Sequence, residues 1–388
     1  MLCVLGLLTA LALPSSGCRR KPAEQVVLYV STDEHIARPI IERFQQQSGI
    51  AVQVVGDTEA KKTTGLVERL RTEKSKPQAD VFWSSEILQS ISLADEGVLD
   101  EHLSDATADW PREWRDGQRR WFAFAARPRV IVFAPDRVPE DQRPQTWMDL
   151  TQSRWRDRLI MADPRFGTTG THLATMLWHW DREVMPGYFS AWAQGIAANN
   201  VRLSTNGNAG VVDAVAKGEA DVGMTDADDV WAAKARGLNV DLIYPAHGLA
   251  ENDNAPAGGK GLGTLLIPNT VARVKGGPHP AAAKALIDFL LSEEVERMLA
   301  ESASHNIPMR ESVRESFPQY AVTDPLTMDW ERIAPLRSKA IDQFFAAIET
   351  IKREREEAAD IRREPESQPA NEPEAATSPA SGDGDGGR

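Results

Sequence analysis

The stretch LIMADPRFGTTGTHLATMLWHW, residues 159–180, decides the fold class of this chain. It passes from a predicted buried strand, Leu159–Ala162, through a polar turn into a predicted helix. Leu173, Met176, Leu177 and Trp180 lie on one face of that helix. A strand followed by a helix is the building unit of α/β proteins, which bind ligands beyond the carboxyl ends of their strands. We therefore predict an α/β fold.

The same alternation continues on both sides of this stretch. Helical patterns cover Ile36–Phe44, Leu66–Leu70 and residues 281–299. At 388 residues with 41% hydrophobic residues, the chain is long enough for two hydrophobic cores. We expect two α/β lobes with a cleft between them. The other candidate strands are Val26–Val30, Ile50–Val55, Asp80–Trp83, Val130–Phe133, Val201–Ser204, Asp221–Met224, Val240–Tyr244 and Thr264–Ile267.

Composition excludes several classes of protein. The 44 Lys and Arg against 57 Asp and Glu give a net charge of −13, so a nucleic-acid-binding surface is not expected. Two cysteines exclude a disulfide framework. The chain shows no nucleophile elbow and no HExxH motif, and we expect no enzyme activity. The spacing of Asp226 and Asp228 leaves a metal-dependent enzyme as the less favoured alternative.

The two ends of the chain differ from its centre. An apolar run, Leu2–Leu13, is followed by Pro14-Ser-Ser-Gly-Cys18 and resembles a bacterial lipoprotein signal peptide. We predict a signal peptide over residues 1–17, a tether over 18–24, and a periplasmic location with a lipid anchor at Cys18; plain secretion is the alternative. Residues 353–388 are predicted to be a charged, disordered tail, whose first part, to about Arg363, extends a preceding helix.

Small polar loops follow five of the predicted strands. In most proteins such residues are helix caps. Five at the strand ends of one fold indicate more, because helix N-termini that face a common cleft attract anions, and carboxylates there suit hard cations. The loops are Ser31–His35, Gly56–Ala60, Ser84–Glu86, Gly167–Thr171 and Thr225–Asp229.

Several short stretches, in this order and spacing, resemble the substrate-binding proteins of bacterial ferric-iron-type ABC importers. The resemblance implies a two-lobed periplasmic binding protein of type II with a two-segment hinge. It also implies a monomeric receptor that delivers a small ligand to a permease and its ATPase. The stretches are Val27–Tyr29, Phe44–Val52, Ala79–Ser84, Gly97–Leu99, Arg127–Val132, Gly218–Asp221, Ile267–Thr270 and Ile287–Ser292.

The resemblance is weaker in the expected metal ligands. Iron-binding members hold Fe(III) with adjacent tyrosines just before a tryptophan, where this chain has Asp229-Val230-Trp231. Their histidine and glutamate ligands fall at Asp33 and Ser85. Fe(III) or another cation with a bound anion remains the expected ligand. A phosphorylated or zwitterionic solute, of the sugar phosphate or aminophosphonate type, is the alternative. The tentative metal ligands are Asp33, Glu86, Asp228 and Asp229.

The family's anion-binding positions match this chain better. They fall on the threonine-rich turn, on Asn208 and on Arg127, whose guanidinium suits phosphate or carboxylate. The full predicted ligand-binding set is Thr32, Asp33, Glu59, Ser85, Glu86, Arg127, Thr168, Thr169, Gly170, Thr171, Asn208, Asp226, Asp228 and Asp229.

The predicted domain boundaries follow from the strand order. One lobe comprises residues 25–124 and 240–305, and the other comprises 125–239 and 306–352. The chain is predicted to cross between the lobes near Phe122–Arg129 and Gly237–Pro245. Closure of the lobes on a ligand is the expected mechanism of binding.

Overall fold

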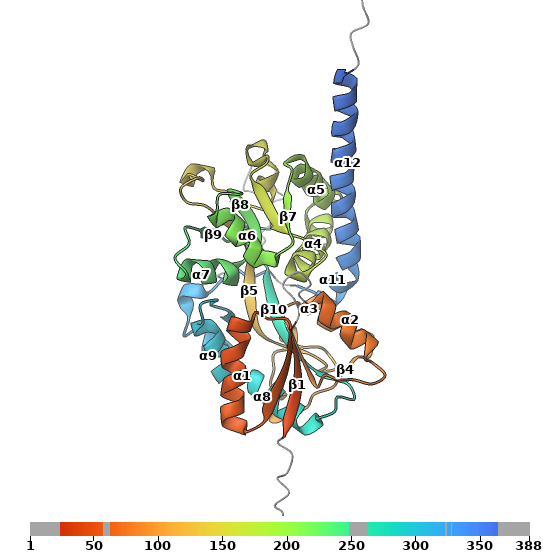
Figure 1. The fold of residues 1–388 in the computed structure, drawn as a ribbon, viewed down its shortest axis with the longest axis vertical. Coiled ribbons are helices and arrows are strands. Elements are labelled where there is room, and N and C mark those ends of the chain that lie inside the picture. Colours follow the sequence, from red (N-terminus) through yellow and green to blue (C-terminus); the bar gives the residue numbers. More distant parts are fainter. Residues whose placement is uncertain (1–23, 57–62, 248–262, 323, 327, 364–388) are drawn as a thin grey trace, which may run out of the picture.

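The computed structural model describes residues 24–56, 63–247, 263–322, 324–326 and 328–363. Its strands form one curled sheet in the order β2-β1-β3-β10-β5-β8-β6-β7. The long strand β5 (Phe122–Phe133) joins the two halves of this sheet. Its first part pairs with β10 (Leu266–Val274) and its last part with β8 (Val222–Asp226). The predicted α/β class is confirmed, and the two halves form two stacked lobes (Figure 1).

The first lobe is a sheet buried on both faces. Along β1, Val26, Leu28 and Val30 pack on one side, and Val27 and Tyr29 pack on the other. This alternation follows from the two-residue period of a strand. The strands of this lobe are β1 (Gln25–Val30), β2 (Ala51–Gly56), β3 (Val81–Ser84), β4 (Leu99–Asp100), β10 and β11 (Ile307–Pro308).

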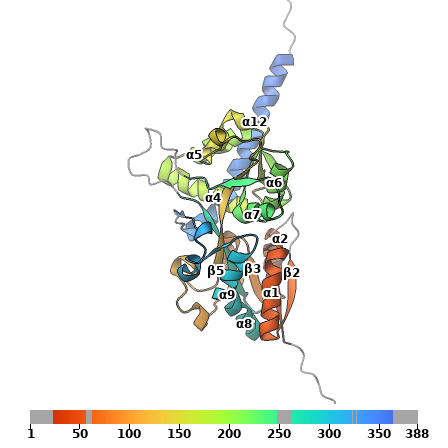
Figure 2. The same cartoon turned by 90° about the vertical axis from the view of Figure 1, so that its left-hand side faces the viewer.

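Helices cover both of these faces. One face is covered by α1 (Glu34–Ser48), α8 (Pro280–Leu290) and α9 (Glu293–Glu301). The opposite face is covered by α2 (Thr64–Thr72) and α3 (Ile87–Asp95). Figure 2 shows α1, α8 and α9 together beside the sheet. The apolar spacing that predicts α1 is confirmed by the burial of Ile36, Ile40, Ile41 and Phe44.

The second lobe repeats this layered arrangement. Its strands are the last part of β5, β6 (Leu159–Ala162), β7 (Arg202–Ser204), β8 and β9 (Asp241–Ile243). The helices α6 (Gly207–Ala216) and α7 (Ala227–Ala235) cover one face. The helices α4 (Gly167–His179) and α5 (Tyr188–Ala198) cover the other, where Trp180, Phe189 and Trp192 are fully buried.

The C-terminal helix α12 (Arg337–Arg363) lies across α4 and α5 and then extends beyond them (Figure 1). Its buried side holds Ala340, Phe344 and Ala347, and Phe344 packs against Trp192 with 6.2 Å between ring centroids. The prediction that a helix continues to about Arg363 is confirmed. Of the described helices, none combines the length and the apolar composition that a membrane span requires. The signal peptide, Cys18 and residues 364–388 lie outside the described residues.

The predicted crossing near Phe122–Arg129 is confirmed by β5, but the second crossing is not at Gly237–Pro245. Strand β9 pairs with residues 131–133 of β5, and Ala246 bridges to Thr146, so the chain stays in the second lobe up to Ala246. The first lobe resumes where Leu265 accepts a bond from the Arg129 N–H at 2.9 Å. The lobe boundaries otherwise remain predictions.

Residues just after α9 remain in the first lobe, although the sequence predicted that the second lobe resumes at residue 306. Ile307 and Pro308 of β11 pair with Ala126 and Ala125 of β5. Two short helices, α10 (Glu311–Arg314) and α11 (Trp330–Ile333), follow before α12. Residues 306–308 therefore lie beside the cleft rather than deep in the second lobe, which places Asn306 next to the site described below.

Candidate functional site

A polar pocket lies where the two halves of the sheet meet. Its volume is about 60 Å³, enough for roughly four water-sized positions. Both lobes contribute to it, because the carboxyl ends of β1 and β3 face those of β6, β7 and β8. It is lined by Ser31, Thr32, Asp33, Ile36, Ser85, Arg127, Ala162, Asp163, Phe166, Gly167, Thr168, Ser204, Thr205, Gly207, Asn208, Asp226, Asp228, Asp229, Asn269 and Asn306.

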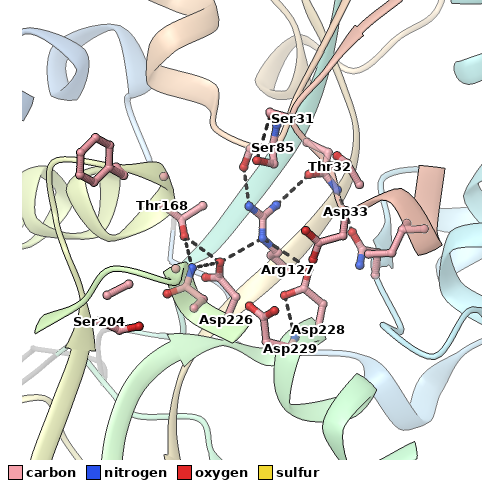
Figure 3. A pocket seen from close by; sticks show the side chains of 18 of the residues that line it. Ser31, Thr32, Asp33, Ser85, Arg127, Thr168, Ser204, Asp226, Asp228 and Asp229 are labelled. Atoms are coloured by element: carbon pink, nitrogen blue, oxygen red, sulfur yellow. Dashed lines mark hydrogen bonds and ion pairs between the residues drawn. The ribbon is translucent and has the colours of Figure 1, made fainter. Parts of the chain in front are cut away.

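Most of the predicted ligand-binding residues come together here. Loops far apart in the sequence converge because the parallel strands before them end at one edge, as Figure 3 shows for the labelled residues. Glu59 lies outside the described residues. The predicted residues in the lining are Thr32, Asp33, Ser85, Arg127, Thr168, Asn208, Asp226, Asp228 and Asp229.

Glu86, predicted as a metal ligand, does not line this pocket. Its carboxylate is fully buried and caps α3, accepting bonds from the N–H groups of Leu88 and Gln89 at 2.9 Å. The hydroxyl of Thr171 donates to the same carboxylate from the second lobe. A capping carboxylate with three donors has little capacity left for a metal ion, so Glu86 joins the lobes structurally.

The predicted anion-binding turn is displaced toward the start of α4. The helix begins at Gly167, so Thr169, Gly170 and Thr171 are buried inside it rather than exposed in the lining. Gly170 has no room for a side chain: an added Cβ would lie 2.5 Å from the carbonyl oxygen of Pro164. The lining residues of this helix are Gly167 and Thr168.

Two helices open onto the pocket in the same way. Gly167 begins α4 with φ 60° and Gly207 begins α6 with φ 65°, a conformation that favours glycine. Neither residue before them, Phe166 nor Asn206, caps its helix with a side-chain bond. The first-turn N–H groups of a helix have no intrahelical partner, and they carry the positive end of the dipole. An anion can therefore take the place of the missing caps.

Asp226 is the centre of a buried ion cluster. Its Oδ1 lies 2.8 Å from Arg129 Nη1, and its Oδ2 lies 3.2 Å from Arg127 Nε. The same Oδ2 accepts from Thr168 Oγ1 at 2.7 Å and from Asn208 Nδ2 at 2.8 Å. Burial by itself raises the pKa of Asp226, but the charges of Arg129 and Arg127 outweigh it and hold the pKa below its ordinary value.

A second group of carboxylates stands beside this cluster. Asp228 and Asp229 lie in the first turn of α7, and together with Asp226 each offers an oxygen within 4.8 Å of the others. Asp228 Oδ2 is 3.6 Å from Arg127 Nε. Asp33 approaches from the first lobe (Figure 3). Four carboxylates, those of Asp33, Asp226, Asp228 and Asp229, stand near two arginines, Arg127 and Arg129, so this group of side chains carries a net negative charge.

Three polar atoms at or beside the pocket have no hydrogen-bond partner among the residues that the structure describes. They are Thr32 Oγ1, Arg129 Nη2 and Asn306 Nδ2, each buried. Arg129 is fully buried, and its Nη1 bonds Thr168, Asn208 and Asp226. A buried polar group without a partner is costly, so these atoms indicate a polar ligand or ordered water.

Sequence reasoning missed several residues in or directly behind the lining of the pocket. Arg129 lies two residues after Arg127, on the same side of β5, and this spacing was a usable signal. Gly167 and Gly207 both begin helices after short strands, which was another. Asn269 and Asn306 carry no local signal, because only tertiary pairing places β10 and residue 306 beside β5.

None of the four tyrosines, all of which the structure describes, lines the pocket. Tyr29 donates to Glu73 at 2.9 Å, and Tyr320 stacks on His305 with 4.0 Å between centroids. The described lining also lacks histidine and cysteine, so the side chains there that could bind a metal ion are oxygen donors: carboxylates, hydroxyls and amides. Carboxylates bind many hard cations, but the phenolate donors that suit Fe(III) are not placed here.

Known proteins resemble the whole of this architecture. Iron uptake protein A1 of Synechocystis sp. is 24% identical over 334 residues, which cover 81% of this chain and 86% of that protein. A putative 2-aminoethylphosphonate-binding periplasmic protein of Salmonella typhimurium is 25% identical over 294 residues, covering 74% and 80%. Iron-bound HitA from Pseudomonas aeruginosa shares the fold with a TM-score of 0.69 at 24% identity, covering 84% and 99%.

These similarities confirm the predicted type II periplasmic-binding-protein fold and the predicted resemblance to ferric-iron-type receptors. The family model of bacterial extracellular solute-binding proteins matches residues 26–302, which include both halves of the sheet. The relatives are binding proteins for different ligands, so the family by itself leaves the ligand open. The chain belongs to the bacterial extracellular solute-binding proteins and is a solute-binding receptor of the ABC importer type.

Proposed function

We propose that the transported ligand is a small zwitterionic solute that carries an ammonium group and a phosphonate, phosphate or carboxylate group. The observation that carries this proposal is the division of charge within one pocket. The N-termini of α4 and α6, with Arg129 behind them, stand at one side, and the carboxylates Asp33, Asp228 and Asp229 stand at the other. A ligand with both charges meets a complementary partner at each end.

The anionic end of the ligand is assigned to the starts of α4 and α6. The N–H groups around Gly167 and Gly207 lack side-chain caps, and Thr168 and Ser204 add hydroxyl groups beside them. The free N–H groups at a helix N-terminus can bind an anion without a metal ion or a charged side chain beside them. Arg129 supports this end from behind, because its buried Nη2 has no partner and its Nη1 fixes Thr168 and Asn208.

The ammonium end is assigned to Asp228, Asp229 and Asp33. The first two come from α7 in the second lobe, and Asp33 precedes α1 in the first lobe. An ammonium group donates three hydrogen bonds and therefore suits several carboxylate oxygens. Because the carboxylates belong to different lobes, a bound ammonium stabilises the closed arrangement more than the open one.

The small volume of the pocket favours compact ligands. A cavity of about 60 Å³ has room for only a few non-hydrogen atoms of a ligand. The relative from Salmonella typhimurium is described as a putative binder of 2-aminoethylphosphonate, and its similarity extends over 74% of this chain.

Fe(III) with a bound anion is the second candidate, and the convergence of Asp226, Asp228 and Asp229 favours it. The iron uptake relative supports the same ligand. This candidate requires Arg127 to leave the carboxylates, because its Nε stands 3.2 Å and 3.6 Å from Asp226 and Asp228. A metal-dependent enzyme is disfavoured, because Asp226 is already fully engaged by four groups.

The remaining parts of the proposal concern the cell envelope. A permease and its ATPase are the proposed partners. The permease receives the ligand when the closed receptor docks on it. The receptor is proposed to act as a monomer on the periplasmic side, held by a lipid at Cys18. Its periplasmic relatives support the location.

Isothermal titration calorimetry tests the ligand class. The purified full chain is first unfolded and refolded to remove any bound ligand, and is then titrated with 2-aminoethylphosphonate, ethylphosphonate, a hexose phosphate and Fe(III)-citrate. We expect the aminated phosphonate to bind at least about 100-fold more tightly than ethylphosphonate, a difference of about 2.7 kcal/mol. Equal affinity for the two phosphonates, or saturable binding of Fe(III)-citrate alone, contradicts the proposal.

A further inference from the structure

The carboxylates Asp226, Asp228 and Asp229 have the mutual spacing of a metal site, yet a side chain of the protein stands among them. The guanidinium of Arg127 approaches Asp226 at 3.2 Å and Asp228 at 3.6 Å through its Nε. Figure 3 shows it between Ser85 on one side and these carboxylates on the other. A permanently charged group in this place has the sign of a bound cation.

Arg127 is held firmly in this position. Its Nη1 donates to Asn269 Oδ1 at 2.7 Å and its Nη2 donates to the carbonyl oxygen of Ser85 at 2.5 Å. Both partners belong to the first lobe, whereas Asp226 and Asp228 belong to the second. The side chain is only 6% exposed, so it has no open solvent into which it can swing.

The charge of Arg127 is permanent, because a guanidinium is not deprotonated in proteins. Asp226 is unavailable to a metal for a separate reason, because both of its oxygens already accept bonds from arginine, threonine and asparagine. A metal ion with two or three positive charges is therefore repelled by Arg127 more strongly than a singly charged ammonium is, and it loses one of its three ligands.

We infer that Arg127 is a specificity-determining residue: it occupies the cation position of the carboxylate cluster and excludes metal ions from the pocket. A singly charged ammonium is still accepted at Asp228, Asp229 and Asp33. The inference deepens the proposed function and rests on the same pocket, but it concerns metal alone.

Removal of the guanidinium charge tests this inference. Arg127→Met retains a side chain of similar length and leaves Asp226 paired with Arg129. Equilibrium dialysis of the full chain against Tb(III), a hard trivalent probe, is followed by metal analysis. We expect Arg127→Met to retain one Tb(III) per chain with at least about tenfold higher affinity than wild type. Asp228→Asn with Asp229→Asn, added to that variant, abolishes the gain.

Arg120→Met is the matched control, since Arg120 pairs with the buried Asp116 at 2.8 Å and does not line the pocket. It gains no metal. Arg127→Gln serves as the second variant if Arg127→Met does not fold, because its amide can still donate to Asn269 or Ser85. Circular dichroism and thermal unfolding verify the fold of each variant.

Two results overturn the inference. One is that wild type binds one Tb(III) per chain with the same affinity as Arg127→Met, and that Asp228→Asn with Asp229→Asn abolishes this binding. The other is a folded Arg127 variant that gains no metal. Neither result depends on the organic ligand, so the inference and the proposed function fail separately: the titration with phosphonates tests the second, and the Tb(III) dialysis tests the first.

Discussion

The buried ion cluster provides the most quantitative prediction, which concerns Asp226→Asn. The substitution keeps the shape of the side chain but removes a negative charge that is only 2% exposed and lies between Arg127 and Arg129. Breaking one partner of a buried ion pair costs about 3–5 kcal/mol, because an unpaired charge is left buried. Arg129 loses its counter-ion and Arg127 keeps only Asp228, at 3.6 Å, so we expect a loss at the upper end of that range.

Urea unfolding, followed by circular dichroism, measures this loss. The matched control is Asp213→Asn in the same lobe, where the pair with Arg236 spans 3.2 Å and both side chains are exposed. Removal of such a surface pair changes stability by at most about 1 kcal/mol. A double-mutant cycle with Arg129→Met then isolates the interaction, and we expect the double variant to be more stable than the sum of the single losses implies.

The result that refutes this reasoning is simple. The free energy of unfolding of Asp226→Asn could lie within about 1 kcal/mol of the wild-type value, with a loss no larger than that of Asp213→Asn. In that case the buried cluster does not form in solution as described. Additive single and double variants lead to the same conclusion for the contact between Asp226 and Arg129.

Three other perturbations have expected outcomes. Gly170→Ala places a Cβ 2.5 Å from the Pro164 carbonyl oxygen and should lower the free energy of unfolding by about 1–3 kcal/mol. The control is Gly117→Ala, which has open space around it and should not lower the free energy of unfolding. Equal effects of the two substitutions would show that the helix relaxes around the added Cβ. Glu86→Ala removes the cap of α3 and should lower the free energy of unfolding in urea by about 1–2 kcal/mol. The ligand affinity measured by calorimetry should change little. A large loss of affinity with unchanged stability would show that Glu86 is a ligand-binding residue. His247 is buried, with its pKa lowered to about 3 by burial and by neighbouring His179 and Arg129. As the pH falls, the imidazole of residue 247 is therefore protonated in the unfolded chain before it is protonated in the folded chain, and the free energy of unfolding falls between about pH 6.5 and 3. His247→Asn should reduce the slope of the free energy of unfolding against pH by about 1.4 kcal/mol per pH unit between pH 6 and 4. An unchanged slope would contradict the assignment.

Much of the fold follows from local sequence patterns. The strands β1, β2, β3, β6 and β8 begin and end within a residue or so of their predicted bounds, because each is a short β-branched run between polar turns. Strand β5 is predicted only from Val130, although it begins at Phe122. Pro128 and two arginines interrupt its apolar pattern, and the strand exists because β10 and β8 pair with it on both sides.

The candidate site was predictable to a different degree. Residues next to strand ends, such as Thr32, Ser85 and Asp228, could be placed in one cleft, because the carboxyl ends of parallel strands meet. Which polar residue faces the cleft and which faces the interior could not be predicted. Glu86 and Thr171 bond to each other because of how α3 and α4 pack, and no local pattern carries that information.

One measurement tests the central claim most directly, namely that the two ends of the ligand bind to different parts of the pocket. Calorimetry compares 2-aminoethylphosphonate with ethylphosphonate in wild type and in the double variant Asp228→Asn with Asp229→Asn. We predict that the double variant loses at least about 30-fold in affinity for the aminated ligand and changes by less than about threefold for the other. Equal losses for both ligands, or no loss for either, would contradict the account.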